Sequence, residues 1–350
     1  MAKRNQRRII IRLLAGALIL FMGILALFFI DRYHTNRTVA FRTEGNQFQI
    51  NRSNKWIDFP VEADGSLNIK ADAPKSEYSH WFKEIAARGV NAVRIYTILP
   101  PDFYRAFFEY NVLTDKPVYL LQGIHISGKN EAQYQYAVQT EHAGQAEHAY
   151  ENQLNSDILE GIRNTIDVIH GNAVMKHQED NASLTYNLNV SAYVMGYILG
   201  RIMDGDFVIA TNKKNDYIFG FDGDYLFTVN ASPCEAWLAA LGNYTVSYEQ
   251  NKYGGVLKLV SWINTPATDP FEHPGVLYEG REYVAGVDLE HIRTTEKFSS
   301  GIFASYFGCP EERSGAADMA PCEIYLDKLK AYHTIPVMMI KEETLWPMQR

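Results

Sequence analysis

Cysteine is scarce in this sequence, and the residue spacings typical of metal sites are missing. Three cysteines among 350 residues are too few for a fold held together by disulfides. His273, His291 and His333 lack the spacing and the carboxylate neighbours of a zinc site. The turn at Asp222–Asp224 lacks the remaining ligand positions of a calcium loop. We therefore predict no metal and no cofactor.

The sequence leaves one possible disulfide undecided. Cys309 and Cys322 are close together in a loop that contains Pro and Gly, and an oxidising exterior would permit them to pair. Closeness in sequence fixes no geometry, so the sequence does not decide the pairing. Cys234 lies on the apolar face of an expected helix and is predicted to be a core residue.

The sequence also lacks a basic stripe of the kind that binds nucleic acid. Residues 1–42 contain eight Lys or Arg and one Asp and so carry +7, and the net charge of −8 for the whole chain leaves −15 on the rest. An acidic surface repels phosphates, which excludes nucleic acid as a partner. The 22 Tyr, 18 Phe and 5 Trp offer faces on which sugars can stack, although most aromatic residues fill cores. Carbohydrate is the expected ligand class, and no partner protein is identified.

Charged and polar residues are absent from residues 13–30, which contain only Leu, Ala, Gly, Ile, Phe and Met. A segment of this length is just long enough to cross a membrane as a helix. Four basic residues between Lys3 and Arg8 precede it, which favours a cytoplasmic N-terminus and an extracytoplasmic C-terminal domain. We expect a single-pass protein of the cell membrane. A cleaved signal peptide is the alternative, but its apolar region would be shorter and would end in small residues.

Strands and helices alternate along the rest of the chain. A helix over 76–88 has apolar residues at i, i+3, i+4 and i+7, and Gly89 and a β-branched strand over 90–97 follow it. A helix after Pro101 and a strand over 118–124 repeat this order. The seven expected strands are 47–50, 90–97, 118–124, 193–200, 256–264, 301–307 and 335–340.

Such alternation selects a parallel sheet with right-handed crossovers. The predicted fold class is α/β, a (β/α) TIM-type barrel that lacks the eighth strand and follows one transmembrane helix; an open doubly wound sheet is the alternative. A further helix is predicted to start at Ser232, whose oxygen can cap the amide of Glu235. The expected organisation is a cytoplasmic basic tail over 1–12, the transmembrane helix over 13–30, a linker over 31–44, the barrel over 45–340 and a tail over 341–350.

Several segments resemble the strand ends of a known family. They include Ala86-Ala-Arg-Gly-Val-Asn-Ala-Val-Arg-Ile-Tyr-Thr, Pro117-Val-Tyr-Leu-Leu-Gln-Gly-Ile and Val194-Met-Gly-Tyr-Ile-Leu-Gly, together with 262–270, 287–298 and 301–306. In their order and spacing these segments resemble a bacterial family of exported, membrane-anchored TIM-barrel proteins, which is similar to retaining glycoside hydrolases. The resemblance covers residues 45–340.

The resemblance implies two catalytic Glu residues, an acid/base at the end of strand four and a nucleophile at the end of strand seven. One carboxyl protonates the leaving oxygen while the other, about 5 Å away, attacks the anomeric carbon. In this sequence Ile202 and Lys341 stand at the two expected positions. Asp204 and Glu342 are the displaced catalytic candidates, and each would need a local backbone shift to act.

Six further residues are predicted to bind substrate, because they lie near the carboxyl ends of expected strands, where barrel sites are found. Arg94 could orient a carboxylate or a sugar hydroxyl, and a structural ion pair is the alternative. A lone histidine such as His125 is more often structural than ligand-binding. Trp262 could offer a stacking face or fill the core. The full set is Arg94, Tyr96, His125, Trp262, Asn264 and Tyr306.

Three hypotheses for the function follow. The first is a barrel with impaired catalysis that at most binds carbohydrate. The second is an active glycosidase or transglycosylase that uses Asp204 and Glu342. The third is a truncated fragment with no function of its own. The replaced Glu residues favour the first and third hypotheses over the second, because two-carboxylate catalysis loses most of its rate without either group.

Overall fold

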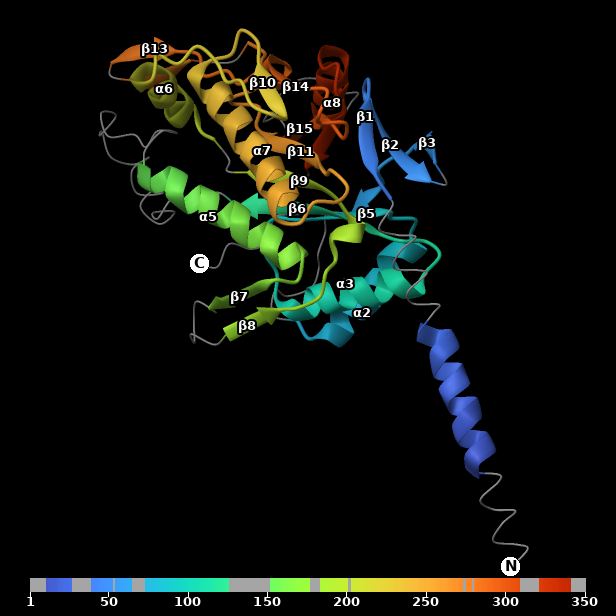
Figure 1. Ribbon diagram of the computed structural model, residues 1–350. Coiled ribbons are helices and arrows are strands. Elements are labelled where there is room, and N and C mark those ends of the chain that lie inside the picture. Colours follow the sequence, from blue (N-terminus) through green and yellow to red (C-terminus); the bar gives the residue numbers. More distant parts are fainter. Residues whose placement is uncertain are drawn as a thin grey trace, which may run out of the picture.

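The computed structural model has an α/β fold built around one parallel sheet (Figure 1). It describes residues 11–26, 39–52, 54–64, 73–125, 152–176, 183–200, 203–272, 275–278, 280–308 and 321–340. The strands of the sheet, in spatial order, are β4 (Ala63–Asp64), β5 (Ala92–Ile95), β6 (Tyr119–His125), β9 (Val194–Gly200), β11 (Leu259–Asn264), β15 (Ile302–Phe307) and β16 (Val337–Ile340).

Every neighbouring pair in this sheet is parallel. The spatial order of the strands follows their order in the chain, as in a (β/α) barrel. However, β4 and β16 stand at the two ends of the sheet and, over the described ranges, do not pair with each other. The sheet is therefore a half-barrel. The α/β class and the parallel strands are confirmed, whereas the predicted TIM-type barrel is corrected to this open form.

The first predicted strand belongs to a different sheet. Residues 47–50 lie in β2 (Gln47–Arg52), which pairs antiparallel with β1 (Phe41–Glu44) and with β3 (Lys55–Asp58). Gly45 has a positive φ of 55° in the tight turn between β1 and β2, and a two-residue turn can join only antiparallel strands. The parallel sheet begins instead at β4.

Helices connect the strands of the parallel sheet and cover its outer face. They are α2 (Lys75–Ala87), α3 (Pro101–Leu113), α5 (Asn152–Ile169), α6 (Gly205–Lys214), α7 (Pro233–Lys252) and α8 (Pro321–Tyr332). Their apolar sides form the larger core with one face of the sheet, and this core includes Val93, Ile95 and Trp262. We call this side of the sheet the outer face.

The start of α7 agrees with its prediction. The hydroxyl of Ser232 accepts a hydrogen bond from the amide of Glu235 at 3.3 Å, and the Glu235 carboxylate accepts one from the amide of Ser232 at 2.7 Å. Pro233 occupies the first turn, where its missing N–H costs nothing. The capping box predicted from the sequence is therefore confirmed.

A second, smaller core lies on the other face of the sheet, which we call the inner face. It includes Leu121 and Phe303 of the parallel sheet and Phe41 and Ile50 of the antiparallel sheet. The amide of Thr43 in β1 donates to the carbonyl of Ser300, just before β15 begins. The antiparallel sheet thus covers the inner face at the amino ends of the strands, on the right of Figure 1.

Three small antiparallel pairs were not predicted from the sequence. They are β7 (Ala173–Lys176) with β8 (Ser183–Tyr186), β10 (Leu226–Thr228) with β14 (Ile292–Thr294), and β12 (Val276–Tyr278) with β13 (Arg281–Tyr283). Two short 3-10 helices precede strands, η2 (Ser191–Tyr193) before β9 and η3 (Leu289–His291) before β14. The strands of the first and third pairs are close in the sequence, whereas β10 and β14 come from distant parts of the chain.

The apolar segment near the N-terminus is helical over residues 11–26. Throughout the described ranges, no helix has both the length and the apolar composition needed to cross a membrane. This finding contradicts the predicted transmembrane helix over 13–30 and the single-pass cell-membrane location that rested on it.

Two of the three cysteines, Cys234 and Cys322, lie within the described ranges. Cys234 is fully buried with a free thiol, and burial raises its pKa well above the ordinary value. It is therefore a core residue, as predicted. Cys322 is disulfide-bonded, and Cys309, the partner that the sequence left undecided, lies outside the described residues.

Candidate functional site

The inner face at the carboxyl ends of the strands carries the strongest candidate site. Arg94 of β5 is in register with Leu121 of β6, which belongs to the inner core. Its neighbours Val93 and Ile95 point to the outer core, as alternation along a strand requires. Tyr96 follows β5 directly and packs against the inner core. Arg94 and Tyr96, two predicted site residues, therefore share one face and one end of the half-barrel.

The guanidinium of Arg94 is buried and incompletely paired. The residue is 8% exposed, and its Nε and Nη2 atoms are buried with no hydrogen-bond partner within the described part of the chain. Its central carbon lies 5.7 Å from the centroid of the Tyr96 ring, within reach of a cation–π contact. Burial lowers the pKa of Arg94 to about 10, because a low-dielectric surrounding disfavours the charged form. Buried donors of this kind need acceptors.

Phe307 is an inner-face aromatic residue that the sequence analysis did not select. It is the last residue of β15, pairs with Ile340 of β16, and packs against the inner core together with Tyr96. Its neighbour Tyr306 was predicted from the sequence instead. Only the direction of each side chain distinguishes the two positions, and a strand alternates that direction at every residue.

His125 is the last residue of β6, and its backbone is in register with Gly200 at the end of β9. It is thus placed at the carboxyl edge of the sheet, as expected. Its contribution to ligand binding stays a prediction.

Trp262 and Asn264 lie on the outer face, away from Arg94. The indole Nε1 of Trp262 donates to the carbonyl of Leu238 in α7 at 2.9 Å, and the side chain is 1% exposed. The Asn264 amide nitrogen donates to the carbonyl of Val287 at 2.8 Å. Both side chains therefore hold the strand against the elements that cover it, and their predicted substrate contacts are untested.

Tyr306 also lies on the outer face, within a network that sequence reasoning missed. Its hydroxyl is 2.7 Å from Nε2 of His333, and Nδ1 of His333 is 3.1 Å from the carboxylate of Glu290. Thr334 donates to the same carboxylate through its amide and its hydroxyl. Burial acts to raise the pKa of Glu290, but the hydrogen bonds from His333 and Thr334 outweigh it and lower the pKa to about 2.

The described structure places only one of the two candidate catalytic carboxylates. Asp204 is the N-cap of α6, and its carboxylate accepts the amide of Phe207 at 2.8 Å. Glu342 lies outside the described residues, as do Ile202 and Lys341. Over the described ranges, no group of three or more His, Cys, Asp or Glu side chains could hold a metal ion.

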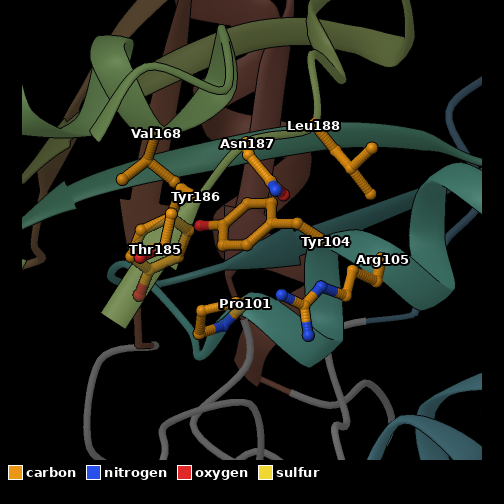
Figure 2. Close-up of a pocket in the computed structure, with 8 residues that line it drawn as sticks. All are labelled: Pro101, Tyr104, Arg105, Val168, Thr185, Tyr186, Asn187 and Leu188. Carbon is orange, nitrogen blue, oxygen red and sulfur yellow. The ribbon is translucent and has the colours of Figure 1, made fainter. Parts of the chain in front are cut away.

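A small hollow on the outer side is lined by Pro101, Tyr104, Arg105, Val168, Thr185, Tyr186, Asn187 and Leu188 (Figure 2). Its cavity volume is about 10 Å³, far below the range of about 300 to 1,000 Å³ typical of small-molecule sites. The hydroxyl of Tyr104 donates to Gln122 and that of Tyr186 to the carbonyl of Leu99. Arg105 pairs with Asp102 at 3.1 Å. These polar groups already have partners, so the hollow is a weaker candidate than the inner face.

No family model matches the chain, and no curated protein matches it. Among solved structures, the chain is similar to a GH2 β-galacturonidase from Eisenbergiella tayi, with a TM-score of 0.45 and 11% identity over 86% of this chain and 38% of that one. It is also similar to a β-D-glucuronidase from Dictyoglomus thermophilum, with a TM-score of 0.43 and 11% identity over 86% and 38% of the two chains. For a β-glucuronidase from Ruminococcus gnavus the TM-score is 0.40 and the identity 10%, over 86% and 37%. These structural neighbours are glycoside hydrolases at low identity, and the chain spans less than two fifths of their length.

Proposed function

We propose that this protein binds carbohydrate on the inner face of the half-barrel, at the carboxyl ends of its strands. The observation that carries the proposal is the buried guanidinium of Arg94, whose Nε and Nη2 atoms have no partner in the described part of the chain. Sugars present several oxygen acceptors on a small, partly apolar ring. A site that pairs a few convergent polar donors with aromatic faces suits such a ligand.

The aromatic faces come from two positions. Tyr96 lies beside Arg94, and Phe307 ends β15 on the same inner face. Both side chains are only partly buried, so each retains surface against which a sugar ring can pack. The antiparallel sheet covers the amino ends of the strands, which leaves the carboxyl ends as the side for a ligand.

Binding without hydrolysis is the form of this function that we favour. Hydrolysis with retention needs two facing carboxyl groups about 5 Å apart. The Asp204 carboxylate is engaged in capping α6 through the amide of Phe207, and a group held at a helix start is not free to protonate a leaving oxygen. The resemblance described above puts Ile202 and Lys341 at the positions of the two catalytic Glu residues.

Calorimetric titration of the full chain with a panel of neutral and acidic monosaccharides tests the proposal. We expect saturable binding that Tyr96→Ala and Phe307→Ala each weaken by about fivefold, since an aromatic face contributes on the order of 1 kcal/mol. Trp56→Ala is the matched aromatic control, because Trp56 lies on β3 in the antiparallel sheet and is 36% exposed. The absence of saturable binding to any sugar would overturn the proposal, as would an equal loss in the Trp56→Ala variant.

A further inference from the structure

We propose that the group bound by Arg94 is a carboxylate, so that the ligand is an acidic sugar of the hexuronate class. This inference rests on the carbohydrate binding proposed above and names the substrate class of the same site. Its basis is the identity of the unpaired nitrogens and the lack of a counter-charge around Arg94 within the described ranges.

The two unpaired nitrogens of Arg94 are the pair that binds a carboxylate side-on. The N–H of Nε and one N–H of Nη2 point in the same direction along one edge of the guanidinium plane, so they can donate two parallel hydrogen bonds. Nε and Nη2 are the atoms that are buried without a partner. The two oxygens of a carboxylate lie in one plane and match this fork, whereas two sugar hydroxyls must each be oriented separately.

The surroundings of Arg94 supply no negative charge within the described ranges. On the inner face the side chain lies against apolar residues such as Leu121, with the Tyr96 ring beside it. The only charge interaction that acts on its pKa comes from Tyr96, and desolvation outweighs it. An uncompensated buried cation is costly, so a ligand that brings a negative charge gains more from this position than a neutral one.

Within the described part of the chain, no residue accepts a hydrogen bond from Nε or Nη2 of Arg94. We therefore assign the acceptor of both N–H groups to the bound ligand.

The test compares sugars that differ only in the carboxylate. We would titrate the full chain at pH 7 with D-glucuronate against D-glucose, and with D-galacturonate against D-galactose. We expect the acidic member of each pair to bind at least about tenfold more tightly, the usual gain from a charge-assisted bidentate pair. Arg94→Met should abolish this preference, and Arg94→Lys, which keeps the charge and loses the fork, should lose most of it. Arg105→Met, which breaks a part-exposed ion pair with Asp102, is the control and should keep it.

The outcomes separate this inference from the function on which it rests. Equal affinity for the acidic and neutral members would overturn the carboxylate and leave carbohydrate binding intact. A preference that survives in Arg94→Met would remove Arg94 from the site. If no sugar binds, or if acetate binds as tightly as a hexuronate, the carbohydrate function itself is wrong.

A stability measurement keeps the test decisive. Because Arg94→Met replaces an unpaired buried charge with an apolar side chain of similar length, we expect its thermal midpoint to equal or exceed that of the parent protein. A fall of more than about 5 °C would mean that the fold itself supplies the partner of Arg94, and this would overturn the inference.

Discussion

The hydroxyl of Tyr306 lies 2.7 Å from Nε2 of His333 on the outer face of the sheet. Burial raises the pKa of Tyr306 well above its ordinary value, so the phenol stays protonated. An ionised carboxylate can only accept hydrogen bonds, so Nδ1 of His333 donates to Glu290. The chain of donors joins β15, the segment before β16, and η3, which are distant in the sequence.

Glu290 is the acceptor at the end of this series of hydrogen bonds. Its replacement should make the free energy of unfolding less dependent on pH in the acidic range. Its pKa is lowered from 4.5 to about 2 in the folded protein. A carboxyl group whose pKa is lowered in the folded protein stabilises the fold while it is ionised. This stabilisation is fully present above pH 4.5 and is lost as the pH falls towards 2. We expect Glu290→Gln to reduce the free energy of unfolding by about 2 to 3 kcal/mol at pH 7 and by much less at pH 2.5.

Urea unfolding at the two pH values measures this difference. Glu296→Gln is the matched control, since Glu296 is exposed in the segment after β14 and should change stability little at either pH. The prediction fails if Glu290→Gln costs the same at both pH values, because the carboxylate would then not be the source of the acid sensitivity.

Local signals in the sequence located most of the parallel sheet. Six predicted strands correspond to β5, β6, β9, β11, β15 and β16, because buried β-branched runs bounded by Gly and Pro are strong signals. The start of α7 was predicted from Ser232 and Glu235 because the capping box is itself local. The antiparallel pairing of residues 47–50 was missed although its signal is local: the two-residue turn at Gly45 joins β1 to β2 and allows only an antiparallel partner.

The two faces of the sheet were the harder part of the site to predict. Both faces of these strands are apolar, since one meets the helices and the other meets the antiparallel sheet. Without a polar face, alternation alone does not reveal which residues point inward. Arg94 and Tyr96 were assigned together correctly in space, but Trp262 and Tyr306 belong to the opposite face. The partners of Glu290 that lower its pKa are His333 and Thr334, which lie 43 and 44 residues further along the chain, and no motif joins them to Glu290.

Trp262 offers a test of this assignment of faces. Its indole donates to Leu238, and a Cβ added at Gly242 would lie 2.5 Å from its ring, so the ring fills the space between β11 and α7. We expect Trp262→Phe to lower stability by about 1 to 3 kcal/mol through the lost hydrogen bond and the smaller ring. Sugar affinity should stay within about twofold, unlike the effect of Tyr96→Ala. Calorimetry and thermal unfolding of the two variants give the comparison, and a large loss of affinity with full stability would place Trp262 in the binding site.

Substitutions at Asp204 test whether the protein only binds carbohydrate or also hydrolyses it. Because its carboxylate caps α6 by accepting the amide of Phe207, Asp204→Asn keeps an acceptor that caps a helix equally well, whereas Asp204→Ala should cost about 1 kcal/mol of stability. We expect the full chain to release no aryl alcohol above background from aryl glycosides, and neither variant to change that rate. Glu342→Gln tests the second candidate carboxylate in the same assay. Turnover by the parent chain that disappears in Asp204→Asn, with an unchanged thermal midpoint, could come only from the chemistry of the carboxyl group. That result would establish an active glycosidase and refute the non-catalytic function, since capping alone predicts an effect in Asp204→Ala and none in Asp204→Asn.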